Sequence, residues 1–335
     1  MEIGKKIFKI VGAVLSVLLA LFLFLYATLG IIGGFMYREA RKYRTYAFTI
    51  PALSRGFTPQ GVEYIGDGTY LTTGYDGKTD ETLLYVAKGK KATRVLLGDA
   101  EGAPLQGHGG GVAAAKDFVY VACEDSLCMF RLSDLIQSNG DRVRSIGELK
   151  LPCKASFCFS DGTNLYAGEF YRKGNFETNL THRMTTPNDD FNPAIVACFD
   201  LSDDGTVVSD GQELPFPSRV LSITGLVQGF AVHDGVCMLS RSYGLVNSKL
   251  EYYAEPYAAG ELEVTIEDDK RTVPLFVLDS SNKFRTLTLP SFSEDLAIAN
   301  DRVVVMNEAA CNKYIIGKLF LADKAYSYPI FSPNK

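Results

Sequence analysis

The sequence has no tryptophan, and three of its 335 residues are histidine, at positions 108, 182 and 233. It has no C-x-x-C pair, so it offers no zinc site of the usual spacing. It also lacks G-x-S-x-G, the motif that exposes a nucleophilic serine, and no motif places a Ser, Cys or His in a triad. The net charge of −5 argues against a nucleic-acid partner, because such partners normally meet a basic face.

Charged side chains are also absent from residues 10–37. A helix that spans a bilayer needs about 20 apolar residues, whereas a secretory signal has about 7 to 15 before a small-residue cleavage site. We therefore interpret residues 1–37 as a basic N-terminal tail and an uncleaved membrane anchor that crosses at residues 10–37, with a cleaved signal as the alternative. Residues 38–45 form a basic linker, and residues 46–335 form the folded body.

The numbers of basic residues on the two sides of this anchor are nearly equal, so they do not decide its orientation. Three lysines precede the apolar run, and four basic residues follow it, namely Arg38, Arg41, Lys42 and Arg44. Long domains cross membranes largely regardless of charge. We therefore predict a single-pass protein of the cell membrane whose body lies on the extracytoplasmic side.

The body shows little helical periodicity and consists of short β-rich runs separated by Asp, Gly, Asn and Ser clusters. Five segments repeat one pattern, which consists of a small or apolar start, a short strand, a polar turn and a strand of alternating apolar residues. They begin at Gln60, Gly110, Ala155, Gln228 and Glu294. A third strand follows each, at residues 83–91, 127–135, 195–205, 274–283 and 318–326. A fourth follows at residues 93–99, 145–152, 211–217, 284–290 and 326–331.

These units predict an all-β fold, a β-propeller of five four-stranded blades with six as the alternative. Two long intervals carry insertions, at residues 172–192 and 245–271. Residues 46–51 match the outer-strand pattern, so they either pair with the last blade and close the ring or belong to a sixth blade.

The repeated pattern, for example "QGFAVHDGVCMLS" from Gln228, resembles that of the NHL, SMP-30/gluconolactonase and strictosidine-synthase-like propellers. The resemblance covers residues 46–331 and concerns architecture. It implies either a binding module or a calcium-dependent lactonase or esterase with acidic and Asn ligands near the central channel. This chain shows no matching set of Glu and Asn ligands at its innermost strands.

Equivalent positions of the blades converge on the central channel of a propeller, so the repeat predicts neighbours. The ends of the second strands align Glu169, Arg241 and Glu308, with Asn307 just before the last. Because buried charges are costly unless paired, these residues predict either a polar pocket at one channel mouth or an internal Arg–Glu network. Glu169 and Glu308 are the candidate cation ligands, and Arg241 could hold a carboxylate or phosphate.

The starts of the first strands give a second predicted ring, made of Gln60, His108, Gln228 and Glu294. His108 lies in "GHGGGV", which either exposes backbone amides to an anion or needs glycine for a tight entry into the blade. His182 lies in the polar insertion, where we expect it to be solvated. His233 occupies a turn position, which favours a structural role.

Seven cysteines are present, and small buried hydrophobic residues are the simplest interpretation. Cys123 and Cys128 bracket "EDSL", a plausible hairpin turn, so they could form a disulfide in an oxidising compartment.

The sequence therefore predicts a module that binds a small polar, saccharide-like ligand or a protein at one channel mouth. The alternative is an SMP-30-like lactonase or esterase that uses calcium, and a third possibility is a structural assembly protein.

Overall fold

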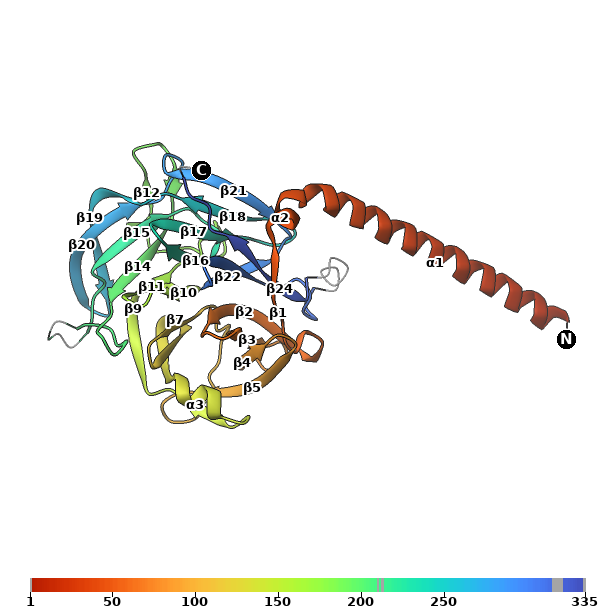
Figure 1. The fold of residues 1–335 in the computed structure, drawn as a ribbon, viewed down its shortest axis with the longest axis horizontal. Coiled ribbons are helices and arrows are strands. Elements are labelled where there is room, and N and C mark those ends of the chain that lie inside the picture. Colours follow the sequence, from red (N-terminus) through yellow and green to blue (C-terminus); the bar gives the residue numbers. More distant parts are fainter. Residues whose placement is uncertain (1, 210, 212–213, 315–321, 334–335) are drawn as a thin grey trace.

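The structure is a computed structural model, and it describes residues 2–209, 211, 214–314 and 322–333. Helix α1 (Glu2–Met36) extends away from a β-rich body, and a short helix α2 (Arg38–Tyr43) joins the two (Figure 1). Lys5–Met36 is long and apolar enough to cross a membrane, with a mean hydropathy of 2.7 over its best window and none of that window buried. The same test would also pass a signal sequence.

Within these described residues, the body consists of five sheets of three to six strands and one small hairpin. In chain order, four sheets are β2-β3-β4-β5-β8 (Phe57–Tyr64, Thr69–Asp76, Thr82–Lys88, Lys91–Gly98, Arg142–Arg144), β6-β7-β9 (Val112–Ala115, Phe118–Arg131, Gly147–Ala155), β10-β11-β14-β15-β20-β19 (Phe157–Ser160, Asn164–Gly168, Ala194–Asp200, Arg219–Ile223, Asp269–Val277, Tyr257–Ile266) and β16-β17-β18-β21 (Val227–His233, Val236–Arg241, Ser248–Tyr253, Lys283–Leu289). The fifth is β22-β23-β24-β1 (Ser293–Ala299, Arg302–Asn307, Lys324–Pro329, Thr45–Thr49), and the hairpin is β12-β13 (Met184–Thr185, Phe191–Asn192). The short helices are η1 (Leu53–Arg55), α3 (Leu132–Gln137) and η2 (Leu180–His182).

The first strands of the five sheets contact one another in a closed series, from β2 to β6, β10, β16, β22 and back to β2. Two of these contacts depend on glycine, since the strands approach backbone to backbone. A Cβ on Gly61 would lie 2.9 Å from the Val112 nitrogen, and one on Gly229 would lie 2.6 Å from the Asp295 Cα. The glycine of the repeated "QG" is therefore required by the close approach of neighbouring first strands.

Asp295 occupies on β22 the repeat position that glycine occupies on β2 and β16. Its side chain is fully buried, and Oδ2 accepts hydrogen bonds from the backbone nitrogens of Val62 at 3.2 Å and Val112 at 3.5 Å. Burial raises the pKa of Asp295 well above its usual range. The carboxyl group thus joins three of the five first strands at the centre of the series.

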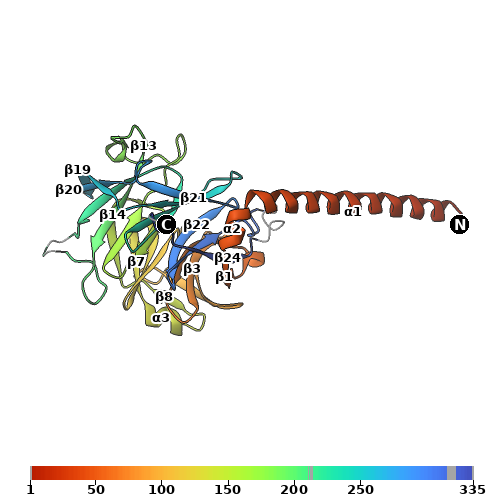
Figure 2. The ribbon, with the colours of Figure 1, turned by 45° about the horizontal axis from the view of Figure 1, so that its top comes forward.

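The segment after α1 and α2 pairs with β24, which agrees with one of the two predictions for residues 46–51. β1 lies antiparallel to β24, with Thr45 opposite Ser327 and Thr49 opposite Lys324. Figure 2 shows β1 and β24 side by side beneath α2.

Several predicted outer strands were wrong. The predicted insertion 245–271 contains β18, which is the third strand of its sheet, whereas β20 leaves that sheet and runs parallel to β15 in the preceding one. In the third sheet the fourth strand is β15 rather than residues 211–217, of which 212 and 213 lie outside the described residues. In the last sheet β24 is the third strand and β1 the fourth, and residues 318–321 of the predicted third strand lie outside the described residues.

The predicted hairpin turn between Cys123 and Cys128 falls within the bounds of β7 (Phe118–Arg131). The side chains of the two cysteines are hydrogen-bonded to each other, so the chain reverses direction between them. The register of β7 with β9 shifts at this point, next to Glu124, whose φ is 59°.

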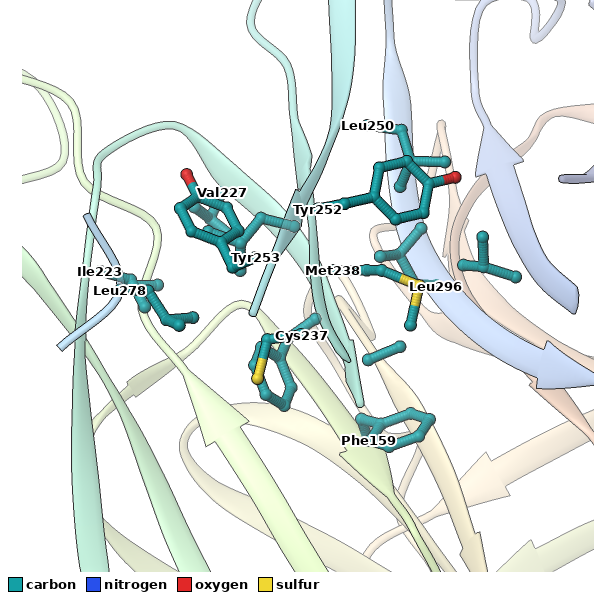
Figure 3. Close-up of a cluster of buried hydrophobic side chains, with 14 of the residues drawn as sticks. Phe159, Ile223, Val227, Cys237, Met238, Leu250, Tyr252, Tyr253, Leu278 and Leu296 are labelled. Carbon is teal, nitrogen blue, oxygen red and sulfur yellow. The ribbon is translucent and has the colours of Figure 1, made fainter. Parts of the chain in front are cut away.

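Apolar side chains fill the spaces between neighbouring sheets. One such cluster joins β17 and β18 to β22, and Met238 lies near Leu296 in it (Figure 3). Tyr252, from β18, is fully buried in this cluster and donates its hydroxyl to the Pro329 carbonyl at 3.1 Å. These contacts hold the fourth and fifth sheets together, and they fix the strand ends that form the candidate site.

Candidate functional site

A cavity of about 1280 Å³ lies where the first strands begin and the second strands end. Gln60, Gln228 and Glu294 reach it from the starts of β2, β16 and β22. Glu169 and Glu308, which directly follow β11 and β23, reach it from the other set of strand ends. The β-repeat therefore brings together side chains that lie far apart in the sequence.

Six of the eight predicted ligand-binding residues line this cavity, namely Gln60, His108, Glu169, Gln228, Glu294 and Glu308. Arg241 and Asn307 do not. Asn307 lines a smaller cavity beside the end of α1, and its side chain donates to the Ser291 carbonyl at 3.0 Å. Their roles in ligand binding remain predictions.

Two of the buried carboxyl groups in the lining contact each other. Glu294 and Glu308 are 4% and 7% exposed and are hydrogen-bonded to each other, which requires a proton between them. Burial raises the pKa of Glu294 well above its usual range, and the neighbouring Glu308 carboxyl adds to this effect. Burial also raises the pKa of Glu308, although the Lys313 charge and hydrogen bonds from Tyr314 and Gln60 oppose it. The Gln60 amide donates to Glu308 Oε2 at 2.9 Å.

An aromatic and cationic group lies beside this acid pair. Lys313 Nζ donates to the Tyr75 hydroxyl at 2.8 Å, and the Tyr75 ring stacks on His108 with centroids 4.6 Å apart. Lys313 and Tyr314, which also line the cavity, could not be predicted from the repeat, because they lie in the loop after β23 and beyond the repeated pattern.

The expectation that His182 is solvated was wrong. Its side chain is buried, and Nδ1 lies 3.0 Å from Glu169 Oε1. Glu169 Oε2 accepts the Ile195 backbone N–H at 3.0 Å. The predicted insertion thus folds back onto the cavity and supplies a partner for one of its carboxylates.

The repeat alignment predicted that Arg241 lies with Glu169 and Glu308, but it does not line the cavity that they share. Its Nη1 lies 2.9 Å from Glu251 Oε1, and its Nε donates to the Gly225 carbonyl at 3.1 Å. Glu251 is 1% exposed and also accepts the Tyr253 hydroxyl at 2.8 Å. Arg241 therefore belongs to an internal network within the fourth sheet, whereas the next residue, Ser242, lines the cavity.

His233 ends β16 at a turn, as its sequence context predicted. The next residues, Asp234 and Gly235, have φ angles of 48° and 75°, which suit a tight hairpin. His233 does not line the cavity.

Cys123 lines the cavity, and its thiol is hydrogen-bonded to Cys128. Both cysteines are free thiols in the structure, as are the other five. A disulfide between them stays a prediction for an oxidising compartment.

The cavity is acidic and partly aromatic. Its lining contains seven carboxyl side chains but two lysines, Lys154 and Lys313. It also contains six Phe or Tyr rings, including Phe170 and Tyr243, which stack with centroids 6.1 Å apart. Such a lining favours ligands that donate hydrogen bonds or carry positive charge, and it disfavours anions.

Glu169 and Glu308, the two candidate metal ligands, already have protein partners. Within the part of the chain that the structure describes, no three His, Cys, Asp or Glu side chains gather as a cation site. These residues do not fit the calcium site implied by the resemblance to lactonases.

No family model matches this chain, and no curated protein matches it. Similar solved structures include a putative glucose dehydrogenase from Thermus thermophilus, at 12% identity and a TM-score of 0.40 over 85% of this chain and 98% of that one. A nidogen/laminin complex is similar at 12% identity and a TM-score of 0.33, over 76% and 77% of the two chains. Sqt1 of Saccharomyces cerevisiae is similar at 8% identity and a TM-score of 0.31, over 76% and 81%. These neighbours include propeller-type proteins, but the similarity is too low to assign a family.

Proposed function

We propose that this protein is a membrane-anchored β-propeller that binds a small polar ligand in the acidic cavity, on the extracytoplasmic side. In this proposal, the five sheets are its blades and α1 is its anchor. The closed series of contacts between the five first strands supports a propeller. The complete exposure of the most apolar window of α1 supports a membrane span, because such a surface is unfavourable in water.

One observation carries the binding function: a cavity of about 1280 Å³ is lined by both the Glu294–Glu308 pair and aromatic side chains. Paired acids and the Gln60 amide offer both acceptors and donors, and rings provide flat apolar faces. A saccharide-like ligand presents hydroxyls and apolar faces together, so it fits this lining. A hydroxylated or cationic side chain of a protein partner would meet the same groups.

Thermal unfolding tests the binding function. The full chain, in a non-ionic detergent, is heated with neutral sugars, amines or sugar acids, one compound at a time. We expect a sugar or amine to raise the unfolding temperature, since a ligand at 100 times its Kd stabilises by about 2.7 kcal/mol. Glu308→Gln should weaken this effect by at least tenfold in ligand concentration, because it removes a charged hydrogen-bond acceptor.

Glu261→Gln is the matched control, since Glu261 is exposed on β19 and does not line the cavity. It should respond to the ligand as the wild type does. The proposal fails if no compound shifts the unfolding temperature, or if Glu308→Gln responds as fully as this control.

The Glu294–Glu308 pair also supports a second candidate, a hydrolase for lactones or esters. Two carboxyl groups that share one proton can serve as general acid and general base. Turnover of a lactone or ester that disappears in folded Glu308→Gln but persists in Glu261→Gln would favour this enzyme. Ligand-dependent stabilisation without turnover would favour the binding module.

A further inference from the structure

A second cavity, of about 210 Å³, lies between the end of α1, α2 and the fifth sheet. Tyr37, Arg41 and Arg44 line it from the helical side, and Lys324, Tyr326 and Tyr328 line it from β24. It also reaches Tyr26 and Ala27, inside the apolar run of α1. The cavity therefore joins the apolar anchor to a basic and aromatic surface of the body.

The walls of this cavity are held in place by contacts between α2 and the body. The Tyr37 hydroxyl donates to Asn247 Oδ1 at 2.7 Å, and Glu39 forms an ion pair with Arg285. Arg302 Nη2 donates to the Tyr43 carbonyl at 2.7 Å. The junction is thus a docked structure, and its basic residues are presented by a fixed helix.

The charges in this cavity have one sign. Among the residues that the structure describes, its lining contains three cationic side chains, Arg41, Arg44 and Lys324, and no carboxylate. Within the described residues, Arg41 and Arg44 form no ion pair, and the Arg44 guanidinium lies over the Tyr326 ring at 4.6 Å from its centroid. Lys324 has one distant carboxylate neighbour, Asp323, at 4.0 Å. These guanidinium groups keep their capacity to bind an anion.

We propose that this cavity binds the phosphate headgroup of an anionic phospholipid. In a bilayer crossed by α1, the junction lies at the membrane surface, where phosphates are the abundant anions. Arg41 and Arg44 would hold the phosphate through paired N–H donors, and the acyl chains would follow α1 past Tyr26. The headgroup would then connect α2 to β24. This proposal rests on the anchor proposed above and is independent of the acidic cavity.

The test compares two double variants with equal loss of charge. Arg41→Gln/Arg44→Gln removes the cations of the cavity, whereas Arg38→Gln/Lys42→Gln removes two cations of the same helix that do not line it. Full chains are placed in nanodiscs of phosphatidylcholine with phosphatidylglycerol, then extracted in mild detergent. Native mass spectrometry counts the phosphatidylglycerol molecules that each chain retains.

We expect the wild type and the Arg38→Gln/Lys42→Gln control to retain phosphatidylglycerol in preference to phosphatidylcholine. The Arg41→Gln/Arg44→Gln variant should lose this preference by at least tenfold. Lys324→Gln, on the opposite wall, should reduce it by a smaller factor. Circular dichroism of each variant confirms that the body is folded.

Equal losses in both double variants would mean diffuse attraction to the membrane and would overturn the proposal. Competition by millimolar inorganic phosphate would also overturn it in favour of a free-anion site. If the chain does not associate with nanodiscs, the proposed anchor has failed. If it is anchored but shows no preference for the anionic lipid, the lipid site alone has failed.

Discussion

Replacing Glu63 with glutamine should flatten the dependence of stability on pH. Glu63 lies on β2 and is 6% exposed; its Oε2 accepts the Ala114 N–H at 3.2 Å and its Oε1 accepts the Tyr64 N–H at 2.7 Å. Burial raises the pKa of Glu63 to about 8 from 4.5, although these two hydrogen bonds oppose the shift. The folded protein therefore holds this proton more tightly than the unfolded chain does.

The sign and size of the effect follow from this difference. Below about pH 4.5 both states are protonated and Glu63 costs nothing, whereas stability falls as the pH rises from 4.5 towards 8. One pKa unit corresponds to about 1.4 kcal/mol, so the loss at pH 7 is about 3 kcal/mol. Between about pH 5 and pH 7, Glu63 alone should lower the free energy of unfolding by about 2 to 3 kcal/mol.

Urea-induced unfolding of the full chain in a non-ionic detergent, followed by circular dichroism at several pH values, measures this slope. The other buried acids contribute equally to the pH dependence of the wild type and of Glu63→Gln. Asp295 is the exception, because the Glu63 charge raises its pKa and the variant removes that effect. The exposed Glu261→Gln should keep the wild-type slope. If Glu63→Gln kept it too, Glu63 would not be a buried acid with a raised pKa.

Two further substitutions test the packing around the candidate site. Arg241→Ala should lower the free energy of unfolding by roughly 1.5 to 3 kcal/mol, because it removes a charged hydrogen bond to the buried Glu251 carboxylate and leaves Lys283, at 3.6 Å, as its cationic partner. Lys249→Ala on the exposed side of β18 should cost under about 1 kcal/mol, and similar urea midpoints for both variants would contradict the network. Gly229→Ala should cost about 1 to 3 kcal/mol or more, because its Cβ would meet the backbone of β22. Gly147→Ala is the control, because its new Cβ meets only the flexible end of Met129, at 3.2 Å. If both variants lowered the unfolding temperature equally, the close approach of β16 and β22 at Gly229 would be contradicted.

The first and second strands could be predicted from the sequence because each has a local apolar alternation and a polar turn. Some outer strands could also be predicted, namely β4, β5, β14 and β21, but others could not, because partner choice is absent from the local pattern. Residues 274–283 were correctly expected to contain strand, yet β20 pairs with β15 of the preceding sheet. β18 gave no signal, since it lies within a stretch without the repeat.

The candidate site could likewise be predicted only where its residues belong to the repeated pattern. Glu169 and Glu308 were found because equivalent strand ends converge, but the alignment was one residue off at Arg241, where the neighbouring Ser242 faces the cavity. Side chains alternate along a strand, so an error of one residue exchanges the two faces. His182 approaches Glu169 through a long loop, and no short-range pattern encodes such a contact.

The pairing of β1 with β24 has a consequence for how the protein is made. The ribosome produces β1 before the other strands of the five sheets, but its partner β24 emerges only after the strands of the other four sheets. The first four sheets can form while β1 waits, so joining the two ends is expected to be a late step in folding. Truncation after β23 would leave β1 an unpaired edge directly after α2, where it could pair with another chain. Strand β24 thus controls whether β1 is protected from aggregation.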